Sequence, residues 1–355
     1  MSRHFSDRVH LPTIITRRRK QRQSVIGDCH KNIKKTGTIR KRPSLTLPAR
    51  NNTLNVQVLL FTLHGGTADG RKWRVTTEVK TIAKAMTIAG SDSGGGAGIQ
   101  ADLKTFQMLD VYGMSAITAV TAQNTLGVHG IYDIPLEGIA REIEAVCEDI
   151  GVDAAKTGML SSPDIIELVA GQVEKQGLTR LVVDPVMIAK GGARLLASHA
   201  EEALRTKLLP LAAVVTPNIP EAETITGRTI DSLDAMKDAA KRIVEEYGAR
   251  AAVVKGGHMP GEPVDVLYDG QQFHLLTGER YETRHTHGTG CTFSAAITAE
   301  LAKGQPLLEA VKAAKRFISL AIKHELGIGG GHGPTNHWAY VRYGGAEPAG
   351  QGERI

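Results

Sequence analysis

A glycine-rich turn that leads into a helix is the most chemically suggestive stretch of this 355-residue chain. It reads Gly288-Thr289-Gly290-Cys291, and small and apolar residues with helical spacing continue to Leu301. Glycine adopts backbone angles that other residues avoid, and a helix start leaves N–H groups unpaired at the positive end of its dipole. These properties suit a phosphate or a phosphoryl group in transfer. The alternative is an ordinary glycine turn beside a buried cysteine.

Cys291 stands at the mouth of this helix, where the pKa of a thiol tends to fall. We therefore expect its thiolate to be available for chemistry. His285 and His287 precede the turn with the spacing of a metal-binding pair. Because the sequence shows no third ligand for them, we interpret both as loop histidines.

Several polar residues are expected at the ends of buried strands. Asp184 follows Leu181-Val182-Val183, Glu221 follows Pro217-Asn218, and Lys255 closes an apolar strand. Magnesium on a nucleotide needs only one or two carboxylates, so Asp184 and Glu221 are candidate magnesium ligands. Alternatively, they are a turn aspartate and a glutamate that caps a helix. A phosphate partner would explain Lys255.

Three further features could surround a small ligand. The segment Ser91–Gly98 contains four glycines and small side chains, so its backbone can close over a ligand. Asp102, one turn into the next helix, either lies on the surface or points back at the ligand. Gln123 follows the second buried strand, and its amide can donate and accept at once, which matches a nitrogen heterocycle. The alternative for Gln123 is an ordinary turn residue.

Strands and helices alternate from Met86 onward. Strands are expected at 86–90, 114–122, 152–156, 181–184, 212–216 and 251–255, and a hairpin at 264–283. Helices are expected after Gly98, Asn218 and Cys291, and at 136–150, 162–176, 197–208, 231–247 and 307–325. This order predicts an α/β fold with a doubly wound, mainly parallel sheet and helices on both faces. In such sheets ligands bind beyond the carboxyl ends of the strands, where Gly90, Asp184, Thr216 and Lys255 fall.

Charge divides the chain into two parts. Residues 1–85 contain 19 Lys/Arg and 4 Asp/Glu, whereas residues 86–355 contain 24 and 33. The basic part, residues 1–85, is interpreted as a disordered extension, a targeting or nucleic-acid tail, or upstream sequence translated from a start codon placed too early. In the last case Val79 or Met86 would be the true start. We expect a domain over residues 86–342 and a tail over residues 343–355.

Composition also limits the function classes. The three cysteines are far apart and form neither a disulfide framework nor a zinc pattern, so we expect a cytoplasmic protein. We expect no membrane segment and no nucleic-acid partner. Walker A spacing is absent, and the cluster at Gly94–Gly98 lacks the third glycine of a dinucleotide-binding loop. A dehydrogenase therefore loses its main support.

Taken together, the motifs resemble those of ribokinase-type kinases, and within that group the hydroxymethylpyrimidine/phosphomethylpyrimidine kinases of thiamine biosynthesis. The resemblance covers residues 86–342 and rests on motifs at 89–104, 120–125, 156–160, 183–187, 216–221, 255–258, 287–291 and 331–337. It implies a ribokinase-like fold and two ATP-dependent phosphorylations, first of the substrate hydroxymethyl group and then of the monophosphate. It also implies a homodimer.

The resemblance implies a role for each matching residue. Gln123 would read the aminopyrimidine edge, with Gly90, Ala97, Met159 and Val186 around the ring. Gly288, Thr289 and Gly290 would form the anion hole for the γ-phosphoryl group. Asp184 and Glu221 would hold Mg²⁺ through water. Lys255, Asn218 and Glu221 would contact ATP.

Cys291 occupies the position where other ribokinase-type enzymes carry an aspartate base. Phosphoryl transfer depends on positioning and charge stabilisation more than on a strong base. Cys291 could therefore accept the hydroxyl proton, or only shape the site while Asp102 or the phosphate accepts it.

Three alternative functions remain open at this stage. A pyridoxine or pyridoxal kinase would share most of these motifs. A non-catalytic pyrimidine-binding protein would release no ADP. A cysteine hydrolase would use Cys291 as its nucleophile, but no histidine is clearly placed as its base.

Overall fold

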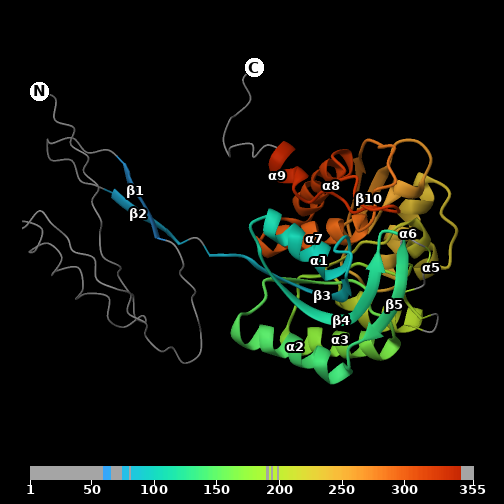
Figure 1. Ribbon diagram of the computed structural model, residues 1–355, viewed down its shortest axis with the longest axis horizontal. Coiled ribbons are helices and arrows are strands. Elements are labelled where there is room, and N and C mark those ends of the chain that lie inside the picture. Colours follow the sequence, from blue (N-terminus) through green and yellow to red (C-terminus); the bar gives the residue numbers. More distant parts are fainter. Residues whose placement is uncertain are drawn as a thin grey trace, which may run out of the picture. The chain divides into compact units, whose positions relative to one another are not determined.

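The computed structural model describes residues 59–64, 74–79, 81–188, 192, 195–197 and 200–344 (Figure 1). A nine-stranded sheet is its central feature. The parallel part of the sheet consists of β3 (Lys84–Asp92), β4 (Tyr112–Asn124), β6 (Ala154–Thr157), β7 (Leu181–Val183), β8 (Val214–Val215) and β9 (Ala252–Val254). The predicted α/β class, with a mainly parallel sheet, is confirmed.

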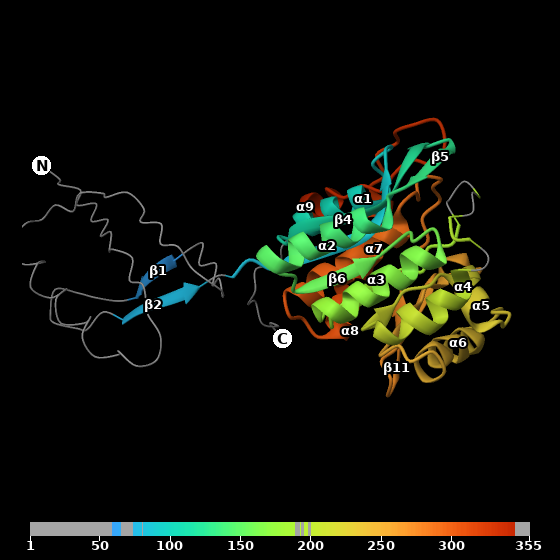
Figure 2. The same ribbon diagram turned by 90° about the horizontal axis from the view of Figure 1, so that it is seen from below.

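Antiparallel strands complete both edges of the sheet. At one edge β5 (Gly127–Asp133) pairs with β4, and at the other β10 (Val264–Tyr268) and β11 (Phe273–Thr277) extend β9. The full order is β11-β10-β9-β8-β7-β6-β3-β4-β5, and Figure 2 shows β5 and β11 at opposite edges. The predicted hairpin is therefore confirmed over residues 264–277. Strand β5 was not expected, because its two glycines obscure any alternation.

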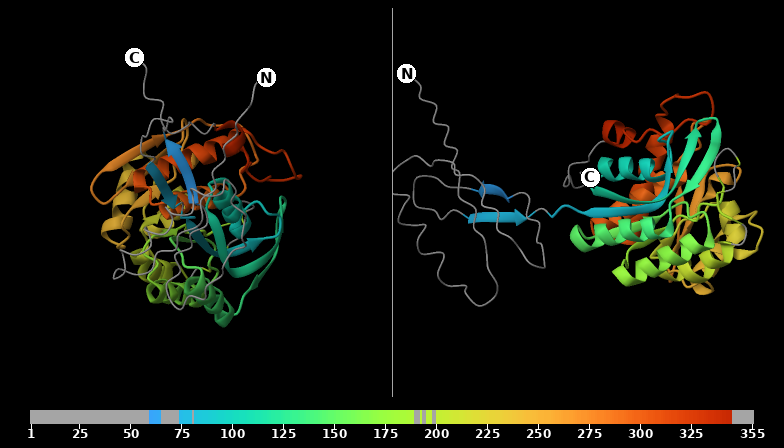
Figure 3. Two further views of the ribbon diagram at one scale, coloured as in Figure 1. Left: turned by 90° about the vertical axis from the view of Figure 1, so that its left-hand side faces the viewer. Right: turned by 60° about the horizontal axis from the view of Figure 1, so that its bottom comes forward.

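Helices cover both faces of the sheet, as predicted (Figures 1 and 3). One face carries α1 (Gly98–Met108), α7 (Thr289–Ala302) and α8 (Leu307–Lys323). The other carries α2 (Leu136–Asp149), α3 (Pro163–Gln176), α5 (Ile219–Thr226) and α6 (Leu233–Glu245). Each face has its own cluster of buried apolar side chains, so the sheet is a layer between two cores.

The remaining helical segments are short. They are α4 (Glu201–Ala203), a π-helical turn η2 (Leu204–Leu208), the 3₁₀ turns η3 (Leu209–Leu211) and η4 (Gly256–His258), and α9 (Ala339–Tyr343). The helix expected at 197–208 is thus a succession of three helical types that continues to Leu211. Several residues before Ala200 lie outside the described part of the chain.

Capping residues explain why helix limits were largely predictable. In α3 the Ser162 hydroxyl accepts a hydrogen bond from the backbone N–H of Ile165, Pro163 opens the first turn, and Gly177 ends the helix at φ 65°. This combination is typical of helix starts and stops. Helix α7 differs because it is buried from Thr292 to Ala302. It therefore forms a rigid central support for the glycine turn at its start.

Two strands lie within the basic segment that was expected to be disordered. β1 (Leu59–His64) and β2 (Arg74–Val79) form an antiparallel pair, and the alternatives for the extension over residues 1–85 stay predictions. The basic runs at 17–22 and 31–42, and residues 345–355 of the tail, lie outside the described part of the chain. Among the described residues, no helix is both long and apolar enough to cross a bilayer.

Candidate active site

A cavity of about 720 Å³ opens at the carboxyl ends of the parallel strands. It brings together residues from segments that are far apart in the sequence. Of the predicted site residues, those that line it are Gly90, Ala97, Gln123, Met159, Asp184, Val186, Asn218, Glu221, Lys255, Gly288, Thr289, Gly290 and Cys291. Asp102 is not among the lining residues. The cavity thus lies where the strand-end rule predicts that a ligand binds.

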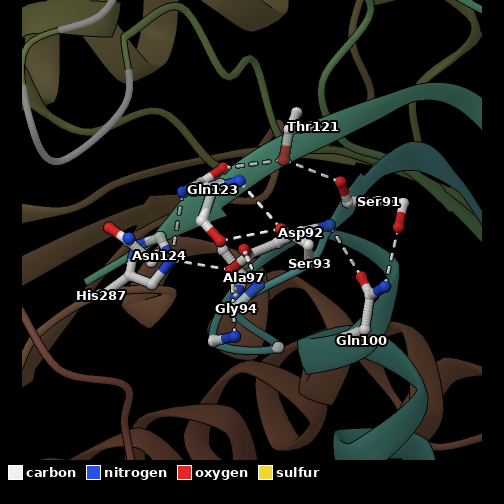
Figure 4. A network of polar contacts seen from close by, with 12 residues as sticks. Ser91, Asp92, Ser93, Gly94, Ala97, Gln100, Thr121, Gln123, Asn124 and His287 are labelled. Carbon is white, nitrogen blue, oxygen red and sulfur yellow. Dashed lines mark hydrogen bonds and ion pairs between the residues drawn. The ribbon is translucent and has the colours of Figure 1, made fainter. Parts of the chain in front are cut away.

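Asp92, the last residue of β3, organises the glycine-rich loop (Figure 4). Its carboxylate accepts hydrogen bonds from the backbone N–H groups of Gly94 (2.8 Å), Gly96 (3.0 Å) and Ala97 (2.8 Å). A fourth contact joins Asp92 Oδ2 to His287 Nε2 at 2.9 Å. Burial alone would raise the pKa of Asp92, but these hydrogen bonds lower it. The carboxylate therefore stays ionised and closes the loop.

The turn before α7 packs directly on this loop. Gly288 has φ 79°, and a Cβ atom there would lie 1.8 Å from the backbone oxygen of Gly96. Gly98, at φ 55°, approaches the Gly90 oxygen similarly, with 2.3 Å for a built Cβ. Only glycine fits such close backbone contacts. The N-terminus of α7 and its unpaired N–H groups therefore face the cavity beside the Ser91–Gly98 loop.

The C-terminal segment Ile328–His337, which we term the strap, supports the turn from behind. His287 donates its backbone N–H to the Gly333 oxygen (3.1 Å), and Thr335 donates its own to the His287 oxygen (3.3 Å). His332 N–H bonds to the Thr125 oxygen (2.8 Å) at the end of β4. The strap thus links the β4–β5 turn to the turn before α7.

One end of the cavity is formed around Gln123. Gln123 is still within β4 rather than after it, which corrects the expected strand limit. Its Oε1 lies 3.1 Å from Thr121 Oγ1, and its Nε2 lies 3.3 Å from His287 Nε2. A Cβ built on Gly90 would be 3.2 Å from Met159 Sδ, so the two residues face each other. Ala97 and Val186 also line the cavity.

The other end carries buried charges. Asp184 is 2% exposed and lies 3.3 Å from Lys255 Nζ through Oδ1. Thr216 and Ser294 donate hydroxyl hydrogen bonds to the same carboxylate, at 3.4 and 3.2 Å. Burial lowers the pKa of Lys255, but the Asp184 and Glu221 charges outweigh it and raise that pKa. The ammonium group is therefore charged beside the start of α7, where Gly290 leaves room for it.

Asn218 and Glu221 form the capping box of α5. The Asn218 side chain accepts from Glu221 N–H (2.9 Å), and the Glu221 carboxylate accepts from Asn218 N–H (2.8 Å). The capping alternative is thus observed, yet both residues also line the cavity. Burial and the nearby Asp184 charge raise the pKa of Glu221 to about 7, although Lys255 opposes the shift.

The structure corrects both expectations for Asp102. Its side chain is neither on the surface nor in the cavity wall, because it is fully buried under the site. Asp102 Oδ1 pairs with the equally buried Lys156 Nζ at 2.9 Å, and Thr87 donates to Oδ2 at 2.6 Å. This pair connects α1 to β6 and places charge beneath Cys291, whose pKa it influences.

Cys291 also departs from expectation. Burial raises the pKa of its thiol to about 12, and the nearby Asp102 and Asp184 carboxylates add to the effect. The Lys156 charge and the Gly98 backbone N–H act in the opposite direction without cancelling it. The helix start alone does not produce a thiolate here, because desolvation outweighs the dipole.

The two histidines bind other protein groups rather than each other. His285 Nδ1 accepts the backbone N–H of Gly333 at 3.2 Å, and His287 contacts Asp92. Within the described residues, no cluster of three or more His, Cys, Asp or Glu side chains could hold a metal ion.

Sequence reasoning missed part of the charged end. Lys315 on α8 pairs with Asp265 on β10 at 2.7 Å, and Asp265 also accepts the Gly256 N–H at 2.9 Å. The Arg280 guanidinium donates to the oxygens of Gly257, Met259 and Gly261 at 3.2, 2.5 and 2.8 Å. A usable signal existed, since Asp265 interrupts an apolar strand and Lys315 adjoins the buried stripe of α8.

Comparison with known proteins gives concordant results. The family described as phosphomethylpyrimidine kinase matches residues 92–336. A hydroxymethylpyrimidine/phosphomethylpyrimidine kinase of Bacillus subtilis is 55% identical over 264 residues, covering 74% of this chain and 97% of the relative. The Haemophilus influenzae kinase of the same name is 56% identical over 270 residues, covering 74% and 100%.

Solved structures show the same fold with two activities in their names. The ADP complex of Bacillus subtilis pyridoxal kinase has TM-score 0.69 and 46% identity, covering 74% of this chain and 100% of the other. The phosphomethylpyrimidine kinase of Clostridium difficile has TM-score 0.61 and 48% identity, covering 68% and 99%. With a cavity of the expected make-up and these identities, the chain belongs to the phosphomethylpyrimidine kinase family.

Proposed function

We infer that the protein is a hydroxymethylpyrimidine/phosphomethylpyrimidine kinase of thiamine biosynthesis. It phosphorylates 4-amino-5-hydroxymethyl-2-methylpyrimidine and then the monophosphate, with ATP as donor. The observation that carries this function is one cavity in which an amide, Gln123, stands at one end and the glycine turn at the start of α7 stands beside buried charges at the other. The relatives named hydroxymethylpyrimidine/phosphomethylpyrimidine kinase, about half of whose residues are identical, support it.

The end of the cavity at Gln123 is proposed to hold the pyrimidine. Gln123 would donate to a ring nitrogen and accept from the exocyclic amine, while Gly90, Ala97, Met159 and Val186 line the space around the ring. The hydroxymethyl group would then extend toward the N–H groups at Gly288–Gly290. These groups would stabilise the charge of the γ-phosphoryl group during transfer.

The charged end is proposed to hold ATP. The Lys255 ammonium group lies beside the start of α7 and would contact the phosphates. Asn218 would contact the nucleotide next to it. Complexes of related pyridoxal kinases with ADP support nucleotide binding in this fold. The residues Asp265, Lys315 and Arg280 extend this end of the cavity and are proposed to border the nucleotide.

Asp184 and Glu221 are proposed to hold Mg²⁺, largely through water. The donor set fits, since burial and the nearby Asp184 carboxylate raise the pKa of Glu221, and a cation would offset both effects. When bound, the ion would neutralise charge on the phosphates. The protein side chains keep the carboxylates and Lys255 in place around it.

Cys291 is proposed to act as a neutral thiol that shapes the anion hole, because its pKa is raised to about 12. We expect Cys291→Ala to lose most activity, and a variant within about threefold of wild type would show that the side chain is dispensable. The pH dependence of kcat separates the two roles. A thiolate base with this pKa predicts a rate that still rises about tenfold per pH unit above about pH 8, whereas a neutral thiol predicts a rate that levels off there, once Glu221 is charged.

A pyridoxal kinase is the second candidate, because solved pyridoxal kinases are 41–46% identical to this chain. The deciding experiment is ADP release from magnesium-ATP by the full chain with hydroxymethylpyrimidine, its monophosphate and pyridoxine at equal concentration. Turnover of both pyrimidines well above pyridoxine is the expected result. Preference for pyridoxine would move the function to vitamin B6 salvage, and no ADP with any of them would indicate a binding protein.

Assembly and location complete the proposal. We propose a cytoplasmic homodimer, in keeping with the family resemblance and with Cys147 and Cys291, which are both free thiols. Sedimentation of the full chain at micromolar concentration would test the dimer, and a monomer at all concentrations would contradict it.

A further inference from the structure

The side chain of Gln123 is held by two neighbours whose own hydrogen bonds are already determined (Figure 4). One is His287, whose Nε2 lies 2.9 Å from Asp92 Oδ2 and 3.3 Å from Gln123 Nε2. The other is Thr121, whose hydroxyl oxygen lies 2.9 Å from the Ser91 carbonyl oxygen and 3.1 Å from Gln123 Oε1. Together they decide which way the amide points.

The proton on His287 can be assigned from its partner. Asp92 accepts three backbone N–H groups, which keep its carboxylate ionised and unable to donate. His287 Nε2 must therefore carry a hydrogen, because a bare nitrogen would set two lone pairs against each other at 2.9 Å. A nitrogen that carries a hydrogen cannot accept one from the amide of Gln123. It can only share its hydrogen with the amide oxygen.

The proton on Thr121 can be assigned in the same way. The Ser91 carbonyl oxygen can only accept, and it lies closer to the hydroxyl than the amide does, at 2.9 against 3.1 Å. The single hydroxyl hydrogen therefore goes to Ser91, and the Thr121 oxygen is left as an acceptor. It requires the NH₂ group of Gln123 on its side.

We propose that His287 and Thr121 are positioning residues that fix the sense of the Gln123 amide, with its carbonyl toward His287 and its NH₂ toward Thr121. This is the reverse of the sense drawn in Figure 4, where Oε1 lies toward Thr121 and Nε2 toward His287. The two ends of an amide have nearly the same shape, so the surrounding hydrogen bonds determine the sense. Each end keeps one unused bond, and Gln123 lines the cavity. The enzyme thereby presents an acceptor and a donor in a fixed order.

This order of acceptor and donor selects between a 4-amino and a 4-oxo heterocycle. The inference rests on the proposed function. A 4-aminopyrimidine offers a donor at the amine and an acceptor at the adjacent ring nitrogen. The 4-oxo analogue offers the reverse pattern. It cannot simply turn over, because its hydroxymethyl group must still reach the glycine turn. With the 4-oxo analogue, donor would face donor and acceptor would face acceptor. The polar groups of Gln123 and of the ring would then lack hydrogen-bond partners, which weakens binding of this analogue.

The backbone of His287 is held independently of its ring, by the Gly333 oxygen and the Thr335 N–H of the strap. Substitution of the ring therefore leaves the turn attached. His287→Leu removes the N–H donor at similar size, whereas His287→Gln can still reach Asp92 with an N–H group. Thr121→Val removes the hydroxyl acceptor with nearly the same shape.

The test compares kcat/KM for 4-amino-5-hydroxymethyl-2-methylpyrimidine with that for its 4-oxo analogue, using the full chain. We expect wild type to favour the amino compound by about 100-fold or more. His287→Leu and Thr121→Val should each reduce that ratio by about tenfold, and His287→Gln should restore most of it. Variants that lower both values equally, with an unchanged ratio, would overturn the inference.

A measurement without substrate keeps the inference separate from the proposed function. Long-range ¹H–¹⁵N correlation spectra of the ligand-free protein identify which ring nitrogen of His287 carries the hydrogen. The expected result is a protonated Nε2, and a bare Nε2 would refute the assignment. If no pyrimidine is phosphorylated but Nε2 is protonated, the proposed function fails while the proton assignment stands.

Discussion

The two ends of the cavity are built on different principles. At the end proposed for the pyrimidine, the Asp92 carboxylate accepts hydrogen bonds from three backbone N–H groups and contacts His287. Its hydrogen-bonding capacity is therefore used within the protein. At the end proposed for the nucleotide, Asp184, Glu221 and Lys255 lie together. Burial and the Asp184 charge raise the pKa of Glu221, and the Asp184 and Glu221 charges raise the pKa of Lys255 against the effect of its burial. The first end is proposed to recognise the pyrimidine through hydrogen bonds. The second is proposed to bind the magnesium-nucleotide through its charged groups.

The glycine turn at Gly288 joins the two ends, and its replacement should disturb both. Gly288→Ala would force a methyl group to 1.8 Å from the Gly96 oxygen at φ 79°. We expect a loss of about 3 kcal/mol or more in the free energy of unfolding and no measurable kinase activity. Gly304→Ala is the matched control, because its φ is 83° but nothing lies within 4 Å. It should cost about 1 kcal/mol. Equal effects of the two substitutions would refute the close contact.

The charged end is tested by Lys255→Met. The variant leaves Asp184 without its ammonium partner, and we expect kcat to fall about 10²- to 10³-fold, with little change in KM for the pyrimidine. Lys312→Met, on the exposed side of α8, is the control and should behave as wild type. A larger rise in the pyrimidine KM than fall in kcat would contradict the division between the two ends.

The reaction rate should depend on pH near neutrality through Glu221 at the same end of the cavity. The pKa of Glu221 is raised to about 7, so its carboxylate is charged above that pH and neutral below it. If the charged form assists Mg²⁺, the rate should decline as pH falls through 7. Lys255 lowers this pKa, so Lys255→Met should move the inflection to higher pH. An inflection that stays in place in the variant would contradict the coupling.

At the pyrimidine end, Asp92→Asn should mainly affect stability. An NH₂ group would face backbone N–H donors, at a cost of about 2 kcal/mol, and the pyrimidine KM should rise. Because the pKa of Asp92 lies below the ordinary 3.8, its contribution is present above that pH and is lost as pH falls further. The free energies of unfolding of the variant and of wild type at pH 3 and pH 7 measure this contribution. A difference between variant and wild type that does not shrink at low pH would argue against it.

The smallest effect is expected at Arg280, which holds the loop at Gly257–Gly261 by three carbonyl contacts. Arg280→Ala should raise the ATP KM about fivefold without changing the pyrimidine KM. Arg280→Lys should not restore it, because a lysine lacks the planar fork of donors. Restoration by lysine would instead indicate a direct charge effect on the nucleotide.

Much of the fold was predictable because its signals are local. Ser162, Pro163 and Gly177 delimit α3, and buried residues at three- and four-residue spacing identify α2 and α8. The position of the cavity followed from the strand-end rule. Strand β5 was not predictable, since it exists by pairing with β4.

The errors concern groups whose behaviour depends on surroundings. The buried position of Asp102 was not predictable, because its place in a helix does not reveal that Lys156, 54 residues later, is buried against it. Cys291 was expected to ionise from its place at a helix start, but the desolvation that raises its pKa comes from distant elements. Lys315 and Asp265 find each other only through the fold.

The most direct test of the account is a crystal structure of the full chain with 4-amino-5-hydroxymethyl-2-methylpyrimidine and a non-hydrolysable ATP analogue. The account predicts the pyrimidine edge against Gln123 and the γ-phosphate at the Gly288–Cys291 turn, with Lys255 beside the phosphates. A pyrimidine bound away from Gln123, or phosphates away from that turn, would contradict it.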